Sequence, residues 1–215
     1  MKTSKSLLIL SITFFLFTLS LNAQTTIGLR SGVNFSTLII EGPDINGSSS
    51  FDANGINLGA FLNIPVGKKF SIQPEFTYDR KSTSLFNFNL SGEPSFKANL
   101  IFNSIDLSVL AKYRFGNEKL GFSILAGPSL NTLINAAFKM KAGGSSVKVK
   151  IPFNGLGMDR LEMGAIFGTA FNYQIGPGKM ILDVRYNLGL TDIFYGTGVT
   201  RNQSIGISLG YAIKI

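Results

Sequence analysis

Residues 204–215 read SIGISLGYAIKI, and this stretch decides the fold class. Large apolar side chains occupy every second position, and serine, glycine, alanine and lysine occupy the positions between them. Successive side chains of a β-strand point to opposite faces, so the stretch predicts a ribbon with one bulky apolar face and one small polar face. Because a tilted strand of roughly 9–11 residues can cross a hydrocarbon core, we expect a membrane-spanning strand that closes a β-barrel.

The same alternation recurs in earlier segments, namely residues 26–36, 56–64, 70–78, 105–115, 120–130, 161–175 and 180–190. Short connections near Val66, Asn117 and Pro177 follow the even-numbered strands, and a long segment follows every odd-numbered strand. Outer-membrane barrels have this layout, with short turns at one end and long loops at the other. The sequence therefore predicts an all-β fold, an eight-stranded antiparallel up-and-down transmembrane β-barrel. Pro74 and Pro128 lie inside strands and are expected to mark bulges.

The N-terminus has the features of an export signal. Lys2 and Lys5 precede an apolar run over residues 7–21, and Ala23 supplies a small residue before a cut ahead of Gln24. This order predicts a signal peptide over residues 1–23 and leaves residues 24–215 as one outer-membrane β-barrel domain. The alternative is an uncleaved anchor helix, which the short apolar run disfavours.

Composition excludes several classes of enzyme. The chain has 215 residues, of which 45% are hydrophobic and 15% charged, and it contains no cysteine and no histidine. Without histidine it lacks the commonest general base and the usual partner of a serine nucleophile, and without cysteine it lacks thiolate chemistry. We therefore expect a protein that is not an enzyme and has no metal, cofactor or nucleic-acid site.

The two faces of the strands indicate which side points inward. A soluble barrel such as a lipocalin lines its interior with apolar groups, whereas a membrane barrel presents such groups to lipid and keeps its interior polar. Here the polar face is rich in glycine and serine, and the apolar face is bulky. An eight-stranded barrel has little room inside, so the small residues belong there. Size and polarity both favour the membrane barrel.

The inward face also carries charges of both signs. They are Arg30, Lys112, Arg114, Arg185 and Lys214 against Glu75, Asp106, Glu162 and Asp183. An isolated charge in a narrow lumen is costly to desolvate, so we expect these groups to pair. The hypothesis is a lumen charge network that plugs the barrel, and the alternative is a proton or ion path, or a gate.

Four sequence blocks resemble the PorT-like outer-membrane β-barrel family of Bacteroidetes. They are residues 27–36 (IGLRSGVNFS), 72–76 (IQPEF), 105–115 (IDLSVLAKYRF) and 126–130 (AGPSL). The third block lacks a proline that the family leads us to expect near its middle, and the chain ends in Ile215 where many outer-membrane proteins end in an aromatic residue. The resemblance implies the outer membrane of a Gram-negative cell, insertion by the barrel-assembly machinery and, for some relatives, a part in type IX secretion.

Three functions remain open at this point. The first is a non-enzymatic barrel whose loops, residues 39–54, 79–103 and 131–160, contact envelope polymers, surface partners or a type IX secretion component. The lysines of the third loop suit anionic lipopolysaccharide. The second is a narrow, porin-like channel for small solutes, which a side-chain-filled lumen disfavours. The third is an outer-membrane enzyme, which the missing histidine and cysteine disfavour.

A further hypothesis concerns assembly. The closing strand must pair with residues 26–36 to satisfy the last unpaired backbone groups in lipid. Its apolar face is therefore expected to be the signal read during insertion, carried by Leu209, Tyr211, Ile213 and Ile215.

Overall fold

The computed structural model describes residues 25–41, 49–88, 96–117, 119–142, 145–152, 160–191 and 199–215. The expected signal peptide, residues 1–23, lies outside these ranges. Within them, no helix is long and apolar enough to span a membrane.

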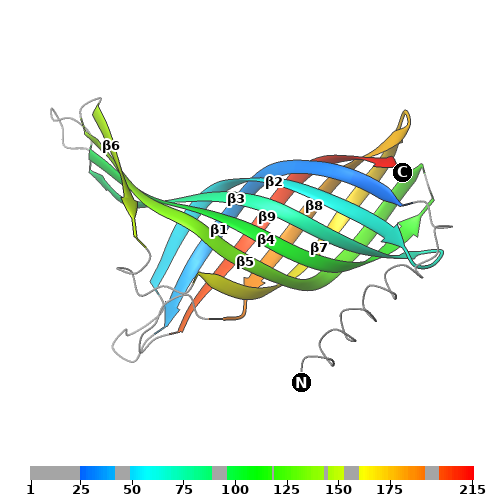
Figure 1. The fold of residues 1–215 in the computed structure, drawn as a ribbon, viewed down its shortest axis with the longest axis horizontal. Helices are drawn as coiled ribbons and strands as arrows, with labels where there is room; N and C mark the ends of the chain where they lie inside the picture. The colour runs from blue at the N-terminus through cyan, green and yellow to red at the C-terminus, as the bar shows by residue number, and fades with distance from the viewer. Residues whose placement is uncertain are drawn as a thin grey trace, which may run out of the picture.

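Eight antiparallel strands form a closed ring (Figure 1). Each pairs with its neighbours in chain order, and β1 pairs with β9 to close the barrel, with Ile27 opposite Ile213. The prediction of an eight-stranded antiparallel barrel is confirmed. Its strands are β1 (Thr26–Glu41), β2 (Ser49–Pro65), β3 (Phe70–Phe88), β4 (Phe96–Gly116), β5 (Leu120–Ala142), β7 (Leu161–Ile175), β8 (Gly178–Gly189) and β9 (Val199–Lys214).

The strands run further than the sequence pattern indicated. β3, β4 and β5 continue well past the predicted boundaries, so much of the expected loop regions 79–103 and 131–160 is strand. A ninth strand, β6 (Ser145–Ile151), pairs only with the end of β5, with Ala136 opposite Ile151. Together the ends of β3, β4 and β5 and the whole of β6 form a sheet that projects beyond the barrel, at the left of Figure 1. We call it the external sheet.

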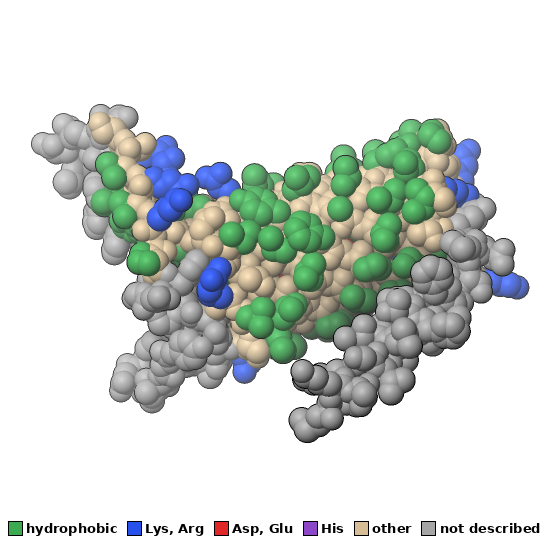
Figure 2. All heavy atoms as spheres, viewed as in Figure 1, with side chains coloured by type: hydrophobic (Ala, Val, Ile, Leu, Met, Phe, Trp, Pro, Cys, Tyr) green, Lys and Arg blue, Asp and Glu red, His purple; other side chains and the backbone are tan. Residues whose placement is uncertain are grey.

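Exposed apolar side chains come from all eight strands of the barrel, and Figure 2 shows those on one side of its wall. Leu29 is 64% exposed and Leu209 is 54% exposed, whereas the inward Asn34, Asp183 and Ser208 are buried. Burying polar groups inside and presenting bulky apolar groups outside is the arrangement that lipid requires. The alternation of the strands therefore places the polar face in the lumen, as predicted.

Two register shifts interrupt the strand pairing, and neither lies at a proline. The β3–β4 pairing shifts between Ser84 and Phe86, and the β4–β5 pairing shifts between Asn103 and Ser104. Pro74 pairs in register with Val109, and Pro128 pairs in register with Ala165. The expectation of bulges at the two prolines is wrong, because neither adds a residue to its strand. The ladder instead skips Pro74 on its β2 side and Pro128 on its β4 side, with the register unchanged.

Candidate functional site

A cluster of two arginines and two carboxylates occupies the middle of the lumen. Arg185 contacts both Glu75, at 2.5 Å, and Asp183, at 3.0 Å. Arg30 contacts the same Glu75 oxygen at 3.1 Å. The Glu75 side chain has no exposed surface, so every charge here is compensated by a neighbour and not by water. The cluster ties together β1, β3 and β8.

Neutral side chains complete the hydrogen bonding of these ions. Arg30 donates to the hydroxyl of Thr77 at 2.9 Å, and Gln73 donates to the second oxygen of Glu75 at 2.6 Å. A buried carboxylate that accepts several hydrogen bonds and two ion pairs is held in one position. The network is therefore built as a fixed plug.

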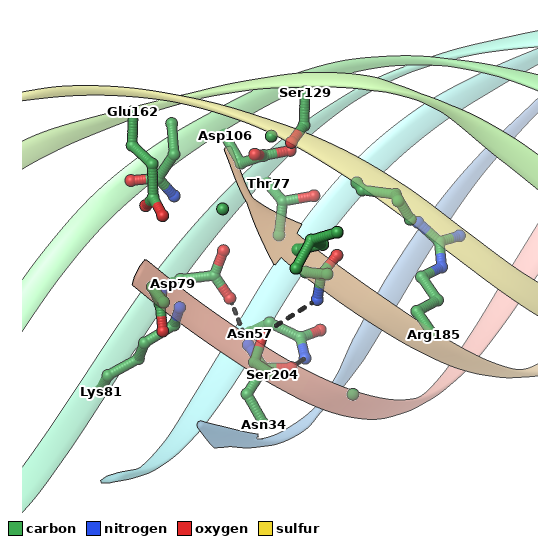
Figure 3. A pocket seen from close by; sticks show the side chains of 18 of the residues that line it. Asn34, Asn57, Thr77, Asp79, Lys81, Asp106, Ser129, Glu162, Arg185 and Ser204 are labelled. Carbon is green, nitrogen blue, oxygen red and sulfur yellow. Dashed lines mark hydrogen bonds between the residues drawn. The ribbon is translucent and has the colours of Figure 1, made fainter. Parts of the chain in front are cut away.

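A second polar cluster lies on the long-segment side of the plug (Figure 3). Asn34 donates to Asp79 at 2.5 Å, and Asn57 donates to the amide oxygen of Asn34 at 2.9 Å. Ser208 donates to Asn57 at 3.1 Å, and it also accepts from Arg30 at 3.4 Å. This chain of hydrogen bonds continues the plug toward the outer mouth.

Two of the predicted network residues line a small cavity at that mouth. Asp106 and Glu162 border a space of about 60 Å³, together with Asp79 and Lys81 (Figure 3). Neither Asp106 nor Glu162 lies within ion-pair distance of a described arginine or lysine. They belong to the rim and not to the central cluster.

The remaining three predicted residues lie at the opposite mouth, where the short turns are. Lys112, Arg114 and Lys214 line a separate cavity of about 250 Å³. Lys112 is buried and donates to Gln73 at 3.3 Å, whereas Lys214 is exposed. The nine predicted charges thus divide into a central cluster of four, two rim carboxylates and three cations at the far end.

The lumen also contains an apolar layer that the sequence pattern did not predict. Phe61, Leu110 and Leu125 lie on inward positions and are buried, in contact with Ile166 and Ile181. The Phe61 ring packs over Gly28 so closely that a Cβ there would lie 2.2 Å from it. The alternation places Phe61 and Leu110 on the polar face, so their positions indicated that they point into the lumen. The two cavities share no lining residue and are separated by this filling.

The external sheet carries a row of lysines on one side. Lys139 lies directly opposite Lys148, and Lys141 and Lys150 occupy positions of the same face. Three of the four are exposed, and Lys139 is half-buried. Figure 2 shows basic side chains gathered at this end of the molecule. The other face of the hairpin is apolar, with Val147 57% exposed.

The proposed assembly residues lie on the lipid-facing side. Leu209, Tyr211, Ile213 and Ile215 are all exposed in β9 and just after it. The Tyr211 hydroxyl donates to the backbone oxygen of Ile175 at 3.1 Å, near the short turn between β7 and β8. Among the described residues, no group of three or more acidic, cysteine or histidine side chains could hold a metal ion.

Residues 22–195 match the family model of the outer membrane protein beta-barrel domain. Among solved structures, OprG from Pseudomonas aeruginosa is 12% identical with a TM-score of 0.47, and the match covers 90% of this chain and 98% of OprG. Ail of Yersinia pestis is 12% identical with a TM-score of 0.45, covering 88% and 99%. The protease OmpT of Escherichia coli is 6% identical with a TM-score of 0.45, covering 91% and 99%. No curated protein sequence matches the chain significantly.

Proposed function

Because this chain belongs to the outer membrane protein beta-barrel family, we propose that it is a non-enzymatic barrel whose external sheet binds the phosphate groups of lipopolysaccharide. The observation that carries the proposal is the row Lys139, Lys141, Lys148 and Lys150 on one face of the sheet. We call it the lysine face.

The position of the lysine face supports a lipid partner. Lys139 lies opposite Asn99 of β4, and Asn99 is on the same side of that strand as the lipid-facing Leu107. The lysine face therefore continues the lipid-facing side of the barrel wall. Its ammonium groups begin where the apolar surface ends, at the level of the headgroups in the outer leaflet.

The charge pattern supports an anionic partner. Like charges directly opposite each other destabilise a sheet, and Lys139 and Lys148 are such a pair. Neither β5 nor β6 contains an acidic residue that could compensate them. Phosphate groups of the surrounding lipid would offset the repulsion and order the hairpin.

Binding to vesicles tests the proposal. The purified barrel is reconstituted, and its thermal stability is compared in vesicles with and without lipopolysaccharide, for the natural chain and for the variant Lys139→Gln/Lys141→Gln/Lys148→Gln/Lys150→Gln. The matched control, Lys68→Gln/Lys69→Gln/Lys119→Gln/Lys179→Gln, removes the same charge at the other end.

We expect lipopolysaccharide to stabilise the natural chain and the control, and to lose most of that effect in the external variant. A lysine near an anionic surface contributes about 1 kcal/mol, so four lysines together contribute about 4 kcal/mol. Equal stabilisation of both variants would contradict the proposal.

A secretion-associated role is a second candidate, favoured by the PorT-like sequence blocks. These blocks, residues 27–36, 72–76, 105–115 and 126–130, lie in β1, β3, β4 and β5, of which β3, β4 and β5 are adjacent and β1 is separated from β3 by β2. Cross-linking in intact cells followed by isolation of the barrel tests this role. Recovery of a type IX secretion component would support it, and recovery of lipid alone would count against it.

A further inference from the structure

We propose that the short-turn mouth of the lumen is a binding pocket for a phosphate group, with Lys112 at its base. This pocket lies at the opposite end of the molecule from the lysine face, so the inference stands apart from the function proposed above. Its volume is about 250 Å³. A water molecule occupies about 30 Å³ of liquid, so the space suits a small hydrated anion and not a drug-sized ligand.

The charge of the lining is all of one sign among the described residues. Lysine and arginine side chains reach it from the turn between β2 and β3, from β4, from β8 and from β9, and no described aspartate or glutamate lines it. The cations are Lys68, Lys69, Lys112, Arg114, Lys179 and Lys214. Converging cations with low-dielectric walls concentrate anions from solution.

Lys112 provides the second, independent observation. The residue is only 7% exposed, and its ammonium group has one hydrogen bond, the 3.3 Å bond to the amide oxygen of Gln73. It takes part in none of the ion pairs that the described residues form. An ammonium group has three donors, and burial without a negative partner is costly. Two donors and a full charge therefore remain for an anion in the pocket.

The base of the pocket also offers neutral donors. Ser71 and Ser123 are buried and line it, and their hydroxyls already accept from Asn63 at 2.9 Å and from Asn172 at 3.2 Å. Neither hydroxyl donates in these two bonds, so its one hydrogen can be directed toward a ligand. Hydroxyl and ammonium donors that converge on one point match the several acceptor oxygens of a phosphate.

The central plug fixes Lys112 in this position. Gln73 accepts from Lys112 through its oxygen and donates to Glu75 at 2.6 Å through its nitrogen. The amide orientation is set by Glu75, whose charge is in turn compensated by the two arginines. The neutral amide of Gln73 therefore positions the Lys112 ammonium group without neutralising it, so its charge can attract an anion in the pocket.

The phosphate has two possible sources, a free phosphate in solution and the headgroup of a phospholipid in the inner leaflet. The first arm of the test titrates inorganic phosphate into the full barrel in a non-ionic detergent by isothermal calorimetry. The second arm compares thermal stability in vesicles of phosphatidylcholine alone and with phosphatidylglycerol. Each arm uses the natural chain, Lys112→Met, Lys68→Gln/Lys69→Gln, and the control Lys119→Gln, which removes an exposed lysine at the same mouth that does not line the pocket.

We expect saturable binding in at least one arm, weakened at least tenfold by Lys112→Met, weakened less by Lys68→Gln/Lys69→Gln, and unchanged in the Lys119→Gln control. Binding of inorganic phosphate in detergent identifies a free phosphate, and a response to phosphatidylglycerol alone identifies a headgroup. If Lys112→Met fails to fold, the double variant of the exposed Lys68 and Lys69 decides. Absence of saturable binding in both arms, or equal binding by the pocket variants and the control, would overturn the proposal. The proposal would also be overturned if acetate competed for the pocket as strongly as phosphate does.

Discussion

Arg185 donates hydrogen bonds to both carboxylate oxygens of Glu75, at 2.5 and 3.0 Å, from the opposite wall of the barrel. β8 and β3, which carry the two residues, are four places apart in either direction around the closed ring. Residues 110 positions apart in sequence are thus joined across the full width of the lumen. This bridge makes the interior a structural element, and it leads to the first two predictions.

Replacing Glu75 with Gln should destabilise the barrel strongly. The change leaves Asp183 as the one carboxylate, among the described residues, within ion-pair distance of Arg30 and Arg185, and removing one partner of a buried ion pair costs about 3–5 kcal/mol. Urea unfolding in lipid vesicles measures the loss. Asp106→Asn at the rim is the control, with a much smaller effect. The double variant Glu75→Met/Arg185→Met should recover most of the stability, and a double variant as unstable as Glu75→Gln would contradict this account.

The natural barrel should conduct no steady current in a planar bilayer. The ion cluster and the packed layer around Phe61 and Leu110 separate the two cavities, and an eight-stranded barrel has little interior to spare. Recordings in dilute and concentrated salt provide the measurement, with a known porin as positive control. Reproducible single-channel steps from the natural chain would instead support the channel hypothesis.

Gly28→Ala should destabilise the barrel by about 1–3 kcal/mol, the usual cost of overpacking. The new methyl group would lie 2.2 Å from the Phe61 ring. Gly67→Ala is the matched control, because its nearest neighbour would be the Cβ of Phe70 at 3.9 Å. Adding Phe61→Leu should relieve part of the effect of Gly28→Ala. Thermal unfolding of the four chains tests the prediction, and equal melting temperatures for the two alanine variants would rule out the close contact.

Tyr211→Asp/Ile213→Asp should block assembly by the barrel-assembly machinery. Both side chains face lipid, and a charge on that face costs up to about 2–4 kcal/mol at the midplane, and less near the interface. Heat-modifiable migration of the membrane fraction reports whether the barrel has closed. Tyr211→Phe/Ile213→Val keeps the apolar face and should assemble normally. Normal migration of the aspartate variant would refute the assembly signal.

The alternation of apolar residues was enough to predict the ring of strands, because only one face of each strand can meet lipid. It did not predict where the strands end. Beyond Tyr78 the apolar alternation of β3 gives way to polar residues, and the alternation of β4 is lost at the apolar run Leu100–Phe102, although the strands continue as paired backbone. Backbone hydrogen bonds to the neighbouring strands extend β3 and β4 there. The side-chain pattern of a single strand does not show how far such pairing continues.

The same limit applied inside the lumen. Charge and alternation identified nine inward ions, but the partners depend on the stagger of strands around the ring. Glu75 is joined to Arg185 and Arg30, whereas Lys112 is joined to none of the described carboxylates. Leu110 and Ile166 fill the lumen beside these ions, and nothing in their local sequence distinguishes them from residues in a soluble core.

The change of polarity along the outward side of the wall fixes how deep the barrel sits. Tyr78 donates to Asn103, and Asn103 donates to Asn135, so a belt of polar groups crosses β3, β4 and β5 next to the Tyr78–Ile105 pair. Arg80 pairs with Asn103 in this belt, and Lys139 lies two outward positions further along β5 than Asn135. If the molecule slid toward its short turns, Arg80 would enter hydrocarbon, and if it slid the other way, Ile105, which pairs with Tyr78, would enter water. The polar belt therefore sets how far the barrel inserts into the membrane and keeps the external sheet outside the hydrocarbon.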